Sequence, residues 1–174
     1  QGAQDLANGV PSNNFTVATM QHKVFARSNI SAIFVNKQPF LNNANDFNGG
    51  LDQYNRTAGV DYNLASADGK WNGKFFYHRS FENDQPDNAY AASSELNYNS
   101  LRWRVRSTLQ NVGENYNPEV GFVRRTGYTR GALSVDYRFW PDSKIFNNYS
   151  IGFDFDSFQM EEYGLTDWDA NIVI

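Results

Sequence analysis

Apolar and polar residues alternate along much of this chain, and the pattern is clearest within residues 53–81. In residues 54–64 the apolar side chains share one parity, and small or polar side chains take the other. Because successive side chains of a strand point to opposite faces, this pattern predicts a strand with one apolar face. Asp68-Gly69 then favours a turn, and residues 71–80 alternate again, which predicts a hairpin. Phe76 breaks the second pattern.

Similar alternation recurs along the rest of the chain. The further predicted strands lie at 15–25, where the alternation is poor, and at 30–36, 90–98, 101–110, 132–139, 149–156 and 167–174. Turn-rich segments separate them, and helical periodicity is not apparent over any stretch of about 11 residues. The sequence therefore predicts an all-β fold, an up-and-down antiparallel meander of about nine or ten strands.

The connections between the predicted strands differ in length. We expect residues 1–13 to be a loop and residues 14–174 to carry the strands of a single domain. Long polar connections at 37–52, 82–88 and 113–130 alternate roughly with short turns, and the last of these is expected to include a short strand. The chain stops within an alternating run, which favours a fragment of a larger barrel with further strands pairing beyond it.

Alternation alone fits two surroundings. In a soluble sandwich or barrel the aromatic face is the core, whereas in a membrane barrel it meets lipid and the polar face lines the interior. The 174 residues carry a net charge of −4, no cysteine and 16% aromatic residues. The absence of cysteine excludes thiolate metal sites, and the acidic balance gives no support for nucleic-acid binding. No transmembrane helix is expected, but a membrane-spanning strand needs only about 9–11 residues.

Charges on the polar faces favour the membrane interpretation. Arg102, Arg104 and Arg106 share one face of a predicted strand, and they repel one another unless carboxylates or anions face them. We expect them to pair with acids of neighbouring strands or to line an anion-attracting interior. The side chains expected to face a barrel interior are Arg102, Arg104, Arg106, Asp136, Arg138, Asp154 and Asp156.

Aromatic residues near the predicted strand ends point the same way. Tyrosine and tryptophan prefer the membrane–water interface, where the ring and its polar tip are both accommodated. The side chains expected at a membrane interface are Trp71, Tyr98, Trp103, Trp140, Tyr149 and Trp168.

Three segments carry a resemblance to a known family. They are residues 28–37, 58–64 and 117–125, of which the phrase NPEVGFVRR in the last is the most specific. They resemble the uncharacterised outer-membrane β-barrel family of Bacteroidota whose members carry an amino-terminal module similar to carbohydrate-binding module family 9. The resemblance spans most of residues 15–140. It implies a barrel fold and an outer-membrane location, and it brings no established chemistry.

No constellation of residues predicts catalysis, a cofactor or a metal. His22 and His78 are far apart in sequence and lack marked partners for a triad or a zinc site. The aspartate pairs near the carboxyl end are more typical of a polar strand face than of acid–base chemistry. Residues 42–52 are rich in oxygen ligands for Ca²⁺ but match no calcium-loop pattern, so a solvated loop is expected.

The first interpretation is therefore an integral outer-membrane β-barrel that acts as a channel, a transport component or a structural member of an envelope complex, and not as an enzyme. Its expected partners are the lipid bilayer and other envelope proteins or the remainder of the barrel, with a glycan or an anion as the ligand. The alternative is a soluble carbohydrate-binding β-sandwich whose exposed tryptophan and tyrosine rings stack on sugars.

Overall fold

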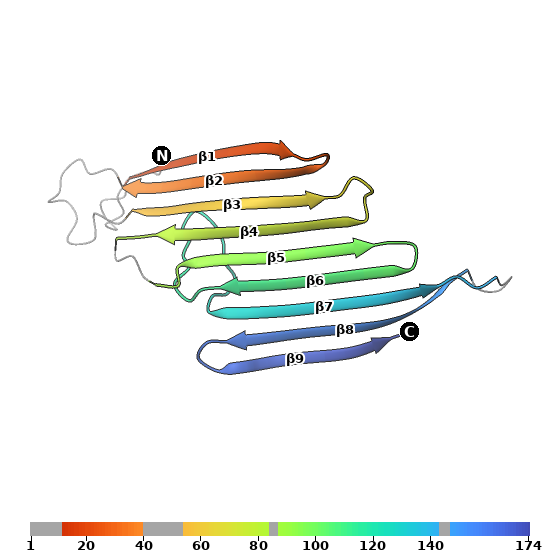
Figure 1. Cartoon of the computed structure of the whole chain (residues 1–174). Coiled ribbons are helices and arrows are strands. Elements are labelled where there is room, and N and C mark those ends of the chain that lie inside the picture. Colours follow the sequence, from red (N-terminus) through yellow and green to blue (C-terminus); the bar gives the residue numbers. More distant parts are fainter. Residues whose placement is uncertain (1–11, 40–53, 84–86, 143–146) are drawn as a thin grey trace.

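The computed structural model describes residues 12–39, 54–83, 87–142 and 147–174. They form one antiparallel sheet of nine strands in which every strand pairs with its sequence neighbours (Figure 1). The strands are β1 (Asn13–Val24), β2 (Ser28–Pro39), β3 (Asn55–Ala65), β4 (Trp71–Phe81), β5 (Tyr90–Asn99), β6 (Trp103–Val112), β7 (Tyr128–Phe139), β8 (Tyr149–Met160) and β9 (Gly164–Val173). The predicted antiparallel meander is confirmed, while the sheet is open between β1 and β9.

The register of the strand pairs gathers the apolar positions of the strands on one side, here called the apolar face. Directly opposed residues of neighbouring strands share a face, and Val105 pairs with Val135, which in turn pairs with Phe153. The larger members of this face are Ile30, Phe34, Val60, Tyr62, Trp71, Phe75, Tyr77, Tyr98, Trp103, Val105, Leu109, Leu133, Val135, Tyr137, Phe139, Tyr149, Ile151, Phe153, Phe155, Trp168 and Ile172.

The apolar face has no protein layer over it in the described part of the chain. Phe153, near the middle of β8, keeps 44% of its surface exposed, and Leu109 on β6 keeps 59%. A sandwich would bury these side chains between two sheets about 10 Å apart. The described residues form a single sheet instead, so the two-sheet arrangement of the soluble alternative is absent from them.

The few buried apolar side chains lie on the opposite side, here called the polar face. Ala91, Val112 and Tyr116 form a buried cluster, with Phe76 packed against it. Tyr116 belongs to the β6–β7 connection, residues 113–127, which passes behind β4 and β5 in Figure 1. This packing explains why Phe76 breaks the alternation of β4, since a loop covers that part of the polar face. The short strand expected within this connection is absent from residues 113–127, and the next strand, β7, begins at Tyr128.

The starts of β1 and β6 differ from those that the alternation indicated. β1 pairs with β2 over its whole length, from Asn13 to Val24, although its apolar residues fall on both faces. β6 starts at Trp103 because the backbone N–H of Ser100 donates to the Trp103 carbonyl at 2.8 Å and the Trp103 N–H donates to the Ser100 hydroxyl at 3.0 Å. These two bonds close a tight turn that contains Arg102, which therefore lies outside the strand.

The β3–β4 turn forms at Asp68-Gly69 as predicted. Gly69 adopts a positive φ of 73°, which an L-residue rarely accepts, and its N–H donates to the Ser66 carbonyl at 3.1 Å. The Asp68 carboxylate accepts bonds from the Ser66 hydroxyl at 2.6 Å and from the Lys70 N–H at 3.1 Å. The turn thus depends on an ionised carboxylate.

This turn gives a pH prediction. The Ser66 hydrogen bond, followed by that of Lys70, holds the pKa of Asp68 below its ordinary value of 3.8. A lowered folded-state pKa stabilises the fold above the unfolded-state pKa, and this contribution is lost as the pH falls through the folded-state pKa. We expect the difference in Tm between wild type and Asp68→Asn to be largest near neutral pH and to shrink below about pH 4. A difference that stays constant on acidification would contradict the assignment.

Candidate functional site

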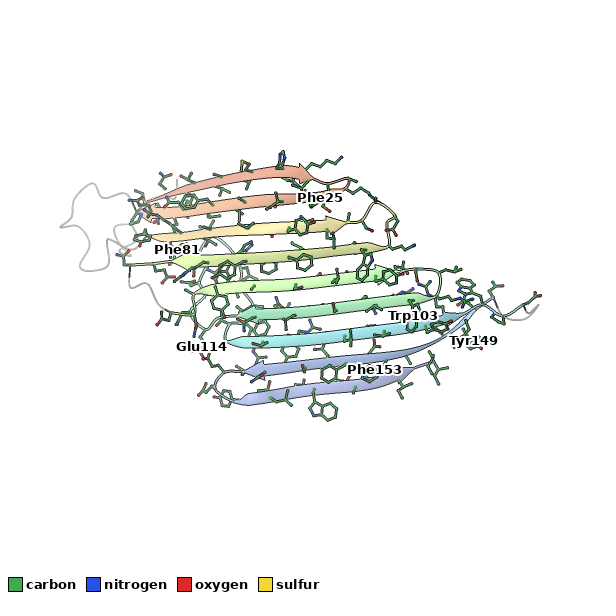
Figure 2. The ribbon with its side chains drawn as sticks, viewed as in Figure 1. Phe25, Phe81, Trp103, Glu114, Tyr149 and Phe153 are labelled. Atoms are coloured by element: carbon green, nitrogen blue, oxygen red, sulfur yellow. The ribbon has the colours of Figure 1, made fainter. Side chains whose placement is uncertain are left out.

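Aromatic rings form a band at the end of the sheet where the β3–β4 and β5–β6 turns lie. The ring centroids of Trp71 and Tyr98 are 4.7 Å apart, and those of Trp103 and Tyr137 are 4.8 Å apart. Tyr149 stacks on the final ring of β7 at 4.7 Å. Figure 2 shows Trp103 and Tyr149 at this same end of the sheet. Four of the predicted interface residues are thereby brought together in ring-to-ring contacts.

The other two predicted interface residues differ in position. Trp140 directly follows β7, and its indole N–H donates to the Leu101 carbonyl at 2.9 Å, so it joins the same end of the sheet. Trp168 lies within β9 opposite Ser157, away from the β7–β8 connection, and is 62% exposed on the apolar face. Trp168 is therefore not part of the aromatic band. The alternation of β9 predicted the face on which Trp168 lies but not its distance from the end of the sheet.

A second aromatic group lies towards the opposite end of the sheet. The rings of Tyr77 and Tyr90 stack at 5.8 Å, and the Arg79 guanidinium lies 5.6 Å from the centroid of the Phe81 ring. Figure 2 shows Phe81 at the end away from Trp103. The apolar face is thus flanked by aromatic side chains on both sides, and those at the second end include an arginine in cation–π contact.

The predicted interior residues of β6 and β8 meet on the polar face. Arg106, Asp154 and Asp156 line a shallow hollow of 450 Å³ over β6 to β9. Asp156 makes two bonds with Arg130, one to Nε at 3.1 Å and one to Nη2 at 2.5 Å, which is the bidentate geometry of a strong pair. The sequence reasoning missed Arg130, although it shares the parity of Asp136 and stands just before the run that predicted β7.

The arginine row of β6 is shorter than predicted. Arg102 lies in the turn, and its guanidinium donates to the Tyr137 hydroxyl at 3.4 Å, on the side of the apolar face. Arg106 donates to the Ser134 hydroxyl at 3.2 Å. Among the described residues no carboxylate lies within 4.0 Å of any of the three guanidinium groups, although Arg104 pairs in register with Asp136. Pairing of this row with neighbouring acids is therefore not seen.

Arg138, the remaining predicted interior cation, is held at the turn end of the polar face. Its Nη2 donates to the Asn99 side-chain oxygen at 2.6 Å and to the Ser100 carbonyl at 3.3 Å. Its backbone N–H donates to the Arg102 carbonyl at 2.7 Å. Arg138 thus fastens the β5–β6 turn to β7, which is a structural role.

The 113–127 loop is fastened to the polar face by a buried asparagine. Asn55, only 3% exposed, donates to the Asn117 carbonyl at 2.7 Å and to the Glu82 carboxylate at 3.0 Å. Its side-chain oxygen accepts the Glu119 backbone N–H at 3.2 Å. One side chain of β3 therefore satisfies two backbone groups of a loop that is more than sixty residues away in sequence.

Further contacts extend this attachment across three strands. The Asn117 backbone N–H donates to the Ser80 hydroxyl on β4 at 3.1 Å, and Lys37 on β2 pairs with Glu119 at 2.5 Å. Burial raises the pKa of the Tyr116 phenol above its ordinary value of 10.0. The loop is therefore a fixed part of the polar face, and a cavity of 690 Å³ lies between it and the strands.

Neither histidine makes a catalytic triad with the described residues. His78 Nε2 lies 3.3 Å from the Asp61 carboxylate, and a side chain at Gly59 would overlap the imidazole ring, so Gly59 makes room for it. The nearby Ser80 hydroxyl accepts the Asn117 N–H and lies 3.4 Å from the Ala89 carbonyl, instead of bonding to the histidine. His22 is an exposed residue of β1.

No metal site is formed by the described residues, in which no three histidine, aspartate or glutamate side chains gather. The calcium candidate at 42–52 lies outside the described residues. No helix in the described ranges is long and apolar enough to cross a membrane.

Comparison with known proteins adds no family to this geometry. No family model, no curated protein and no solved structure matches the chain.

Proposed function

We propose that the nine strands form part of the wall of a transmembrane β-barrel in a bacterial outer membrane. The observation that carries this proposal is the apolar face, which extends from β2 to β9 and is uncovered by the described residues. Soluble monomers rarely expose apolar patches larger than a few hundred Å². Such a face is suited to contact with lipid, and the polar face would then line a water-filled interior.

The dimensions of the strands support the same proposal. Each strand contains 10 to 12 residues. A strand tilted by about 45° needs about 9–11 residues to cross a bilayer. The aromatic band at the turn end and the aromatic group at the other end then lie where the two membrane–water interfaces would be.

The open edges of β1 and β9 are part of the proposal. Unpaired backbone groups are costly in hydrocarbon, so a sheet in a bilayer must close. We propose that further strands pair with both edges, from the same protein or from a partner in the envelope. The barrel interior then contains the charged residues of β6 to β8 and the 113–127 loop, and it serves the passage of a solute or the assembly of an envelope complex. No catalytic step is proposed.

Nitroxide scanning tests which solvent meets which face, and the absence of native cysteine makes it direct. Single cysteines at Val135 and Phe153 would carry the label on the apolar face, and cysteines at Ser134 and Asp154 would carry it on the polar face. In reconstituted protein we expect the apolar-face labels to collide with dissolved oxygen and not with a nickel chelate. The polar-face labels should show the opposite preference, because oxygen concentrates in hydrocarbon and the chelate stays in water.

Three outcomes of this experiment are distinguishable. A packed protein core would protect Val135 and Phe153 from both collision agents, which would overturn the proposal and favour the soluble alternative. Reversed preferences would place lipid against the polar face, which would also overturn the proposal. A requirement for detergent and a heat-modifiable gel migration are the accompanying results expected of a folded barrel.

A further inference from the structure

The cavity beneath the 113–127 loop has the size of a ligand site. Its volume of 690 Å³ falls within the range of about 300–1,000 Å³ that is typical of sites for small organic molecules. Its floor is the polar face between β2 and β8, and its roof is the loop, which Asn55 and Ser80 hold in place. The cavity is therefore a half-open hollow between two parts of the chain that are fastened together.

The lining of this cavity is unusually apolar for its side of the sheet. Ile33 and Val35 of β2 fall on the polar face, as do Phe76 and Phe158, and all four line the cavity. The loop adds Phe122, which is 89% exposed. On a face that is otherwise rich in charged, polar and small side chains, this group offers a surface for a hydrophobic ligand body.

The charged side chains of the lining are all arginines. Arg124, Arg125 and Arg130 line the cavity together with the imidazole ring of His78, and no described aspartate or glutamate does. Arg130 is paired with Asp156, and His78 lies beside Asp61. Arg125 Nη2 donates to the Met160 sulfur at 2.7 Å, a weak acceptor, and neither Arg124 nor Arg125 has a carboxylate within 4.0 Å among the described residues. An incoming anion would therefore displace no ion pair from these two guanidinium groups.

We propose that this cavity binds a hydrophobic organic anion, with its apolar body between Phe76, Phe122 and Phe158 and its carboxylate or similar head on Arg124 and Arg125. Arginine is suited to this role because its planar fork matches a carboxylate in bidentate geometry. The polar face and the 113–127 loop form this ligand site by themselves. The proposed binding therefore does not depend on whether lipid or protein meets the apolar face, and its failure would leave the proposed function standing.

Calorimetric titration with naphthalene-2-carboxylate and its neutral amide tests the proposal on the reconstituted full chain. We expect the carboxylate to bind about tenfold more tightly than the amide, the gain of one good charged hydrogen-bond pair. Arg124→Gln combined with Arg125→Gln should remove this preference. The matched control, Arg102→Gln with Arg104→Gln, removes the same charge outside the cavity and should leave the preference intact.

A second variant tests the position of the ligand. Gln110 lines the cavity from β6, and Gln110→Trp would fill part of the space without removing a member of the buried cluster. It should weaken binding of both the carboxylate and the amide. The proposal would be overturned if wild type bound neither compound, if the preference survived the loss of both loop arginines, or if Gln110→Trp left both affinities unchanged.

Discussion

Leu133→Arg is expected to lower the free energy of unfolding in phospholipid vesicles by about 2–4 kcal/mol, the cost of an arginine near the bilayer midplane. Leu133 lies at the middle of β7 on the apolar face, opposite Ser107 and Phe155. Its matched control is Thr108→Arg, on the polar face at the middle of β6, where the register places Thr108 opposite Glu95 and Ala132. The control should cost about 0.5 kcal/mol or less, as surface substitutions usually do.

A third variant separates a bilayer from a packed protein core. This variant is Leu64→Arg. Leu64 lies on the apolar face near the end of the sheet that carries the β3–β4 turn, where the register pairs it with Gly73. In a membrane the cost of arginine falls to about 0–1 kcal/mol near the interface, so Leu64→Arg should be much milder than Leu133→Arg. Guanidinium titration followed by tryptophan fluorescence measures all three variants. Equal losses at Leu64 and Leu133 would speak against lipid on this face.

Asn55→Ala is expected to release the 113–127 loop from the polar face. The substitution removes the partner of the Asn117 carbonyl and of the Glu119 N–H in a site that is almost fully buried, while the Glu82 carboxylate keeps its bond from Asn117 Nδ2 at 2.7 Å. Leaving such groups unsatisfied costs about 1–3 kcal/mol. Because each 1.4 kcal/mol corresponds to about a tenfold change, loop opening should increase roughly 5- to 150-fold.

Trypsin reports this opening, because the loop carries Arg124 and Arg125 as exposed cleavage sites. Cleavage of a fold that opens and closes rapidly follows the population of the open form. The matched control is Asn63→Ala on the same strand and face, which removes one bond to Asn29 far from the loop. The control should leave the rate of loop cleavage unchanged. Equal acceleration in both variants would mean that β3 is weakened as a whole and that Asn55 does not act as a specific anchor.

The strands and their faces could be predicted because they are local properties of the sequence. The alternation of residues 54–64 and 101–110 shows which side chains share a face, and the register then aligns neighbouring strands face to face. The β3–β4 turn could be predicted equally well, because aspartate and glycine favour the backbone conformation of a tight turn. Whether the sheet closes stays a prediction, because the described residues supply only one open sheet.

The candidate site was predicted only in part, because its contacts join distant residues. Asn55 and Asn117 are 62 residues apart in sequence, and nothing in the alternation of β3 indicates that a loop will cover Asn55. Phe76 was the one local signal, because it is an aromatic residue at a position of the polar face. In the structure it packs against the buried cluster that includes Tyr116 of the loop. The pair of Arg130 and Asp156 was missed because β7 begins earlier than its alternating run suggested.

The strict neighbour order of the sheet also has an evolutionary consequence. Since every strand bonds only to its predecessor and its successor, a hairpin could be duplicated or deleted without rerouting any other connection. In the barrel proposed above, each such event would change the circumference by about 10 Å, two strand spacings, and barrel diameter grows roughly linearly with strand number. Duplication of a short stretch of gene would then widen the proposed barrel in small steps and leave the existing strand pairs intact.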